Sequence, residues 1–177
     1  MVMAPSMRKL ALTAHVGSSV GWLGAVAAFL ALAVAGLWSP AAETVRAAYL
    51  AMDLTYWYVI VPLGLASLLT GLVSSLGTEW GLVRHYWVLV KLLATIPLTM
   101  LMLVHTQPVG YVARIATTRA LSSADLSGLR VQLFAYAVLA LVVLLVVTGL
   151  SIYKPRGRTQ FGARKPDRQS HVGAPST

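Results

Sequence analysis

The sequence contains no cysteine and few charged residues. Without cysteine the chain has no disulfide, no thiolate metal ligand, no CxxCH haem attachment and no thiol nucleophile. Glycine-rich phosphate loops, HExxH and GxSxG motifs and paired carboxylates within apolar sequence are also missing. Only 11% of the 177 residues are charged. The candidates that remain for chemistry are a few histidines and one lysine within apolar sequence.

Long apolar runs dominate what is present. Hydrophobic residues make up 58% of the chain, and four runs, at about 10–37, 55–76, 85–104 and 131–153, can each cross a hydrocarbon layer of roughly 30 Å as a helix. Continuous runs favour helices over a membrane β-barrel. The sequence predicts an all-α, four-transmembrane-helix bundle with up-down-up-down topology over residues 1–153, followed by a basic, disordered tail at 154–177.

Positive charge is concentrated at one predicted membrane edge. The net charge is +9, and most Lys and Arg residues lie at the termini and in the short second connection. The positive-inside rule therefore predicts a multi-pass protein of the cytoplasmic membrane with both termini cytoplasmic. We expect the tail to lie at anionic lipid headgroups and do not expect it to bind nucleic acid. A membrane-protein partner and a homo-oligomer both stay open.

The first outer connection is predicted as a loop at residues 38–54, and the second outer connection, the longest of the chain, is predicted at residues 106–130. Ser39-Pro40 stops the first helix. Ser122 or Ser123 is a candidate N-cap, so the fourth helix is expected to start before the membrane. Pro97 is expected to kink the third helix, and the five tryptophans are mostly interpreted as markers of the aromatic belts.

Small and polar side chains form stripes on the first two helices. Gly17 and Gly21 form a small-xxx-small step typical of close helix contact. One face of the first helix then carries His15, Ser18, Ser19 and Trp22. The second helix carries Gly64, Ser67, Gly71, Ser74 and Ser75 at helical spacing. Such stripes are typical of interhelical seams, although the second could also let a flat ligand approach closely.

A lysine and two histidines mark the third helix, which runs from His85 to His105. Lys91 is expensive in a membrane span, so it is expected to face the bundle interior or to snorkel to the headgroups. His15 and Lys91 lie at a similar depth, on the order of 8–9 Å from the cytoplasmic edge. A bis-histidine haem site needs two facing histidines at matched depth, a condition that only His15 with His85 meets. Both terminal histidines of this helix also suit an ordinary interfacial position.

Three segments carry a family resemblance. LTAHVGSSVGWLGA, VIVPLGLASLLTGL and WVLVKLLATIPLTMLMLVH resemble an uncharacterised actinobacterial four-helix membrane family related to copper-resistance protein D and the HemJ-type protoporphyrinogen oxidase. The resemblance implies that His15 and Lys91 match residues that bind haem or support porphyrinogen oxidation there. It also implies that His105 roughly matches a later histidine. The oxidase pattern of Pro-Arg-Leu and Tyr-His after Trp22 is missing here.

These observations lead to one functional prediction and two alternatives. We expect one b-type haem or porphyrin within the bundle, in a redox role, with His15 as axial ligand. Lys91 or His85 would be the second ligand or a propionate partner, and Gly71 would permit close approach. The first alternative is a copper-handling protein that uses His105 with Met100, Met102 or Met52 at the outer face. The second is a structural or partner subunit without a cofactor.

Overall fold

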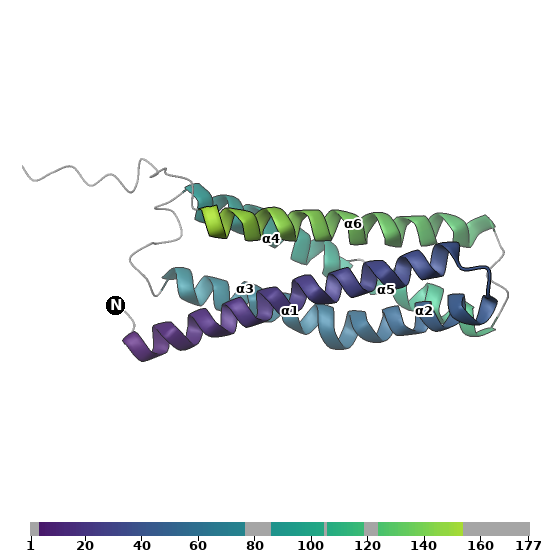
Figure 1. Cartoon of the computed structure of the whole chain (residues 1–177), viewed down its shortest axis with the longest axis horizontal. Coiled ribbons are helices and arrows are strands. Elements are labelled where there is room, and N and C mark those ends of the chain that lie inside the picture. Colours follow the sequence, from purple (N-terminus) through teal and green to yellow (C-terminus); the bar gives the residue numbers. More distant parts are fainter. Residues whose placement is uncertain (1–3, 77–85, 105, 119–123, 154–177) are drawn as a thin grey trace, which may run out of the picture.

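The computed structural model describes residues 4–76, 86–104, 106–118 and 124–153. These residues form helices that run side by side along one long axis (Figure 1). The elements are α1 (Pro5–Trp38), α2 (Ala42–Thr55), the π-helix η1 (Tyr56–Ile60), α3 (Val61–Leu76), α4 (Tyr86–Val104), α5 (Thr106–Thr118) and α6 (Ala124–Tyr153).

Four stretches of the described chain are long and apolar enough to cross a membrane: 5–38, 42–75, 89–115 and 127–153. They alternate in direction, and the start of α1 and the end of α6 lie at the same end of the bundle (Figure 1). The predicted fold, an all-α four-helix transmembrane bundle with up-down-up-down topology, is confirmed. Which side of the membrane holds the termini stays a prediction, and the tail at 154–177 lies outside the described residues.

The first predicted loop, at 38–54, is wrong for most of its length. Ser39 is extended, with ψ of 133°, as expected of a residue before proline, but the helix resumes at Ala42. The buried residues of α2 are Val45, Ala48, Tyr49 and Met52. Their i, i+3, i+4, i+7 spacing is that of an amphipathic helix. Glu43 and Arg46 are exposed and lie on the polar side of this helix.

The second span is therefore one long helix, interrupted only by the π-turn of η1. This π-turn ends just before Pro62. Proline has no N–H and its ring crowds the carbonyl four residues earlier, and a helix commonly absorbs such a misfit by a local change of hydrogen-bond register. The chain thus continues from α2 into α3 without a loop.

The second outer connection, at 106–130, is largely helical in its described residues. α5 occupies 106–118 and packs against α2, while α6 begins at Ala124. This start lies seven residues before the apolar run at 131–153, and whether it lies before the membrane stays a prediction. The candidate caps Ser122 and Ser123 lie outside the described residues. α5 places the buried side chains of Val109, Val112 and Ala113 in the core.

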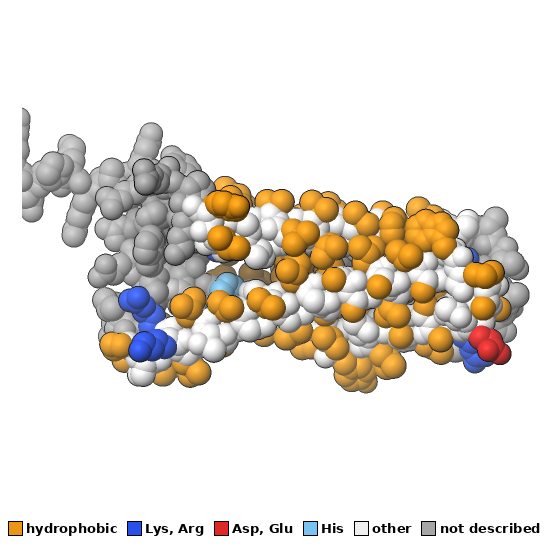
Figure 2. Space-filling view, viewed as in Figure 1, with side chains coloured by type: hydrophobic (Ala, Val, Ile, Leu, Met, Phe, Trp, Pro, Cys, Tyr) orange, Lys and Arg blue, Asp and Glu red, His pale blue; other side chains and the backbone are white. Residues whose placement is uncertain are grey.

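The outer surface of the bundle is largely apolar. Leu10, Val20 and Leu69 are each more than 60% exposed, and orange apolar side chains cover the visible face along most of its length (Figure 2). A water-soluble protein rarely exposes so continuous an apolar surface. This surface suits contact with lipid, as four membrane-spanning helices require.

Three aromatic or imidazole rings lie directly on glycines of a neighbouring helix. An added Cβ would lie 2.8 Å from Tyr49 Cζ at Gly36, 3.2 Å from Trp22 Cε2 at Gly64, and 3.0 Å from His15 Cε1 at Gly71. His15 and Trp22 are about two turns apart on α1, and the glycines beneath them have the same spacing on α3. We call these three contacts the ring-on-glycine seam.

The predicted glycine step on α1 is only half correct. A Cβ at Gly21 would lie 3.2 Å from Leu63 Cδ1, whereas a Cβ at Gly17 or Gly24 would meet nothing within 4 Å. The polar stripe of α3 does form an interhelical seam, since the Ser67 and Ser19 hydroxyls are 2.7 Å apart. The close approach that Gly71 permits is made by α1 itself.

Arg130 joins α6 to the end of the seam at Gly36. Its Nε donates to the Tyr49 hydroxyl at 2.9 Å, and its NH2 donates to the Gly36 carbonyl. The guanidinium also lies 5.7 Å from the centroid of the Tyr49 ring, within cation–π range. One side chain thus connects α1, α2 and α6.

We expect Gly36→Ala to destabilise the bundle, because the new methyl group would overlap the Tyr49 ring. Overpacking of this kind costs about 1–3 kcal/mol. Gly24→Ala is the matched control, since its Cβ meets nothing within 4 Å and alanine favours a helix by roughly 0.5–1 kcal/mol over glycine. Denaturation in one detergent measures both variants. A Gly36→Ala protein as stable as the Gly24→Ala protein would contradict the seam.

Candidate functional site

His15 is held by the backbone of the neighbouring span. Its Nδ1 lies 3.0 Å from the Ser67 carbonyl oxygen. A carbonyl only accepts, so Nδ1 carries the proton, and the lone pair of the neutral imidazole is on Nε2. The Thr70 hydroxyl donates its own hydrogen to the Ala66 carbonyl at 2.6 Å. Its Oγ1, 3.4 Å from Nδ1, is therefore a second and weaker acceptor for the His15 N–H.

The ring of His15 is also fixed by packing. It lies on Gly71, where any side chain on α3 would push it away. The hydrogen bond between Ser19 and Ser67 joins the same two helices about one turn further along α1. Among the described residues Nε2 has no hydrogen-bond partner. The pale-blue imidazole lies at the edge of a hollow between α1 and the opposite helices (Figure 2).

Lys91 points across the bundle to α6. Its Nζ donates to Ser151 Oγ at 3.0 Å, and Ser151 in turn donates to the Val147 carbonyl at 2.9 Å. Leu98 and Met102, which share a helix face with Lys91 by their spacing, are buried. The face that carries Lys91 is therefore an interior face.

His15 and Lys91 lie at the same end of the bundle, where α1 begins and α6 ends (Figure 1). His15 is contributed by the α1–α3 side and Lys91 by the α4–α6 side. The structure therefore puts a neutral nitrogen base and a cation on the two sides of this end.

The other predicted ligands are not brought together by the described residues. His85 and His105 both lie outside them. Met52 and Met102 are buried, whereas Met100 is 57% exposed and points away from Met102, as residues two apart on a helix do. In the described ranges no group of three His, Asp or Glu side chains could hold a metal ion. Three thioethers therefore do not converge on one copper site.

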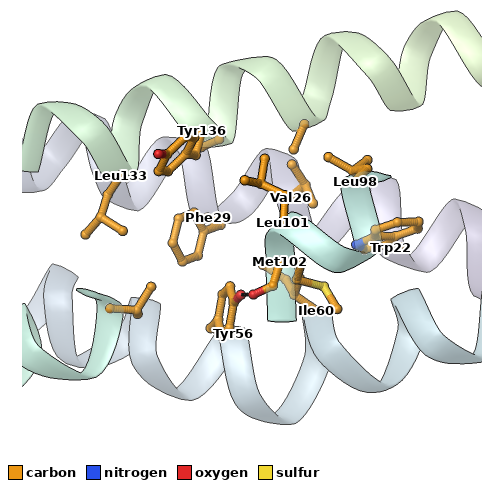
Figure 3. Close-up of a pocket in the computed structure, with 13 residues that line it drawn as sticks. Trp22, Val26, Phe29, Tyr56, Ile60, Leu98, Leu101, Met102, Leu133 and Tyr136 are labelled. Carbon is orange, nitrogen blue, oxygen red and sulfur yellow. Dashed lines mark hydrogen bonds between the residues drawn. The ribbon is translucent and has the colours of Figure 1, made fainter. Parts of the chain in front are cut away.

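Trp22 was interpreted as part of an aromatic belt, and this is wrong. It is 3% exposed and lines an apolar cavity in the middle of the bundle together with Phe29, Tyr56 and Tyr136 (Figure 3). The sequence contains a signal for this position. Trp22 is 12 residues beyond Leu10, where the apolar run begins, roughly 18 Å along a helix axis, which is too deep for either interface.

Comparisons with protein-family models, curated proteins and solved structures find no match to this chain. The resemblance to the copper-resistance and HemJ-type families therefore stays a prediction. The residues that indicate a function are His15 and Lys91.

We expect Ser151→Ala to lower the free energy of unfolding by about 0.5–1.5 kcal/mol, because the Lys91 ammonium loses an acceptor. In a Lys91→Met background the same change should cost little. Thr148→Ala is the matched control, since Thr148 lies one turn earlier on α6 and donates to the Leu144 carbonyl at 2.7 Å. Denaturation of the four variants of the cycle and of the control measures the coupling. An equal loss from Ser151→Ala in both backgrounds would show that the two side chains do not interact.

Proposed function

We propose that this chain binds one b-type haem or porphyrin at the end of the bundle where His15 and Lys91 lie. It would do so as a multi-pass protein of the cytoplasmic membrane with both termini inside. The observation that carries the proposal is the hydrogen bond from His15 Nδ1 to the Ser67 carbonyl. It leaves Nε2 as the nitrogen able to bind iron.

The donor set at His15 fits an axial ligand. Histidines that bind metals almost always donate their other ring N–H to a carbonyl or a carboxylate, which fixes the tautomer and the ring orientation. His15 has this second hydrogen bond, and Gly71 provides a flat seat for its ring. A histidine-bound haem iron would supply reversible one-electron chemistry.

Lys91 suits the role of a positive counter-charge to the carboxylates of the haem. A haem brings two carboxylates into a region of low dielectric, where a nearby ammonium is a strong electrostatic partner. Lys91 is already held in the interior by Ser151, so little side-chain freedom would be lost. His85 as second axial ligand stays a prediction, and so does contact of the tail at 154–177 with anionic headgroups.

The test is haem titration of the full-length protein purified in detergent. We expect the wild type to take up one haem per chain, with a shifted Soret band and a b-type α band after dithionite reduction. His15→Ala should lose these bands. His171→Ala, which removes a histidine of the tail, is the matched control and should keep them.

Stability decides how a loss of haem is interpreted. His15→Ala must be compared with the wild type by denaturation before haem is added. A folded His15→Ala protein that retains the wild-type spectrum would overturn the proposal. A wild-type protein that takes up no haem would overturn it too, and would favour a partner subunit without a cofactor. Copper bound by this colourless protein would instead favour the copper alternative.

A further inference from the structure

A small cavity lies in the middle of the bundle, where side chains from α1, η1, α4, α5 and α6 line it (Figure 3). Its volume is about 70 Å³. A water molecule takes up about 30 Å³ in the liquid, and an apolar cavity of about 150 Å³ admits a molecule as large as benzene. This cavity therefore has room for a molecule of roughly two or three heavy atoms.

The wall of the cavity is almost entirely apolar. Its two phenol groups are already engaged, because the Tyr56 hydroxyl donates to the Met102 carbonyl and the Tyr136 hydroxyl accepts from Gln132 Nε2 at 2.7 Å. A buried water needs about two to four polar partners, and apolar cavities that lack them stay dry. An occupant of this cavity must therefore be apolar as well as small.

One donor in the wall has no partner. Trp22 Nε1 is buried and lacks a hydrogen bond within the described part of the chain, and the indole nitrogen is on the side of the ring toward Met102 and the cavity (Figure 3). A single donor is too little to hold a water molecule. It does favour an occupant whose atoms carry lone pairs, and its N–H signal in NMR reports on whatever lies beside it.

The surroundings of the bundle supply a class of molecule that meets these conditions. Dissolved gases without a dipole enter hydrocarbon readily, because they have no polar group to leave unpaired there. The four spans expose apolar side chains along their length, and the cavity is not fully enclosed. A gas can therefore reach it from the lipid. Whole lipid chains are far larger than the cavity.

We propose that this cavity binds a small apolar gas dissolved in the bilayer, and that dioxygen, whose atoms carry lone pairs, is such a ligand. Binding is driven by dispersion contacts with a wall that otherwise faces empty space. The site is independent of the proposed haem site, because none of its lining residues is His15 or Lys91. The cavity holds one such molecule, so its occupancy saturates with pressure.

The first test uses xenon, an apolar gas that occupies protein cavities. The full chain is placed in nanodiscs with its indole nitrogens isotope-labelled, and the Trp22 signal is assigned by its loss in Trp22→Phe. We expect this signal to shift with xenon pressure and to reach a plateau. Trp57 is 48% exposed and serves as the internal control. Its signal should change only in proportion to pressure, as the xenon content of the lipid does.

A cavity-filling variant locates the bound gas. Ala137 is 4% exposed and lines the cavity, so Ala137→Leu should lower the plateau of the Trp22 shift at least several-fold. Ala135→Leu is the matched control, since Ala135 is exposed on the same helix and should keep the plateau. Saturation-transfer NMR of the xenon nucleus should follow the same pattern, and it needs no Trp22 variant if Trp22→Phe does not fold.

The second test concerns dioxygen, which is paramagnetic and broadens the signals of nearby protons. We expect it to broaden the Trp22 N–H signal, and added xenon should reduce this broadening by competition while Trp57 is unaffected. A Trp22 shift that stays proportional to xenon pressure would overturn the proposal. A plateau that survives Ala137→Leu would also overturn it, because xenon would then lie elsewhere. Broadening of Trp22 that xenon does not reduce would overturn the assignment of dioxygen as a ligand.

Discussion

The bundle depends on the close contact of rings with glycines between α1 and the long second helix. In a bilayer, helices gain no hydrophobic free energy from leaving lipid for one another, so association relies on close packing and interhelical hydrogen bonds. The ring-on-glycine seam supplies the packing at Gly36, Gly64 and Gly71. Hydrogen bonds from His15, Ser19 and Arg130 run along the same interface. The spacing of His15 and Trp22 on α1 matches the spacing of Gly71 and Gly64 on α3. This match fixes the register between the two helices.

The same seam determines the chemistry that the interior can offer. His15 and Trp22 both lie on glycines of α3, but their ring N–H groups differ in hydrogen bonding. The imidazole gives its N–H to a carbonyl and keeps a lone pair, whereas the indole keeps an N–H without a partner. One ring is therefore prepared to donate an electron pair and the other a proton in a hydrogen bond. The lone pair at the first ring is the feature on which the proposed haem ligation rests.

The sequence predicts the spans better than it predicts their connections. Apolar runs predict membrane helices because a helix that faces lipid must be apolar along its length. The shared face of His15, Ser18, Ser19 and Trp22 follows from helical spacing alone. α2 was missed because its charged residues outweighed the buried i, i+3, i+4, i+7 pattern that ends at Met52. Gly71 was correctly singled out as a place of close approach. Which side chain lies against Gly71, however, depends on the register between two helices, and the helical spacing within one segment does not give that register. The depth of Trp22 could be predicted from its position in the apolar run, but the cavity beside it forms only when all four spans pack together.

The tautomer of His15 tests the account most directly. Solid-state NMR of the protein labelled at its histidine ring nitrogens, with the signal assigned by its loss in His15→Gln, reports which nitrogen carries the proton. The account predicts a proton on Nδ1 and a bare Nε2, because the Ser67 carbonyl lies 3.0 Å from Nδ1. A proton on Nε2 would contradict it. The hydrogen bond to α3 would then be absent, and the nitrogen assigned to the iron would already be occupied.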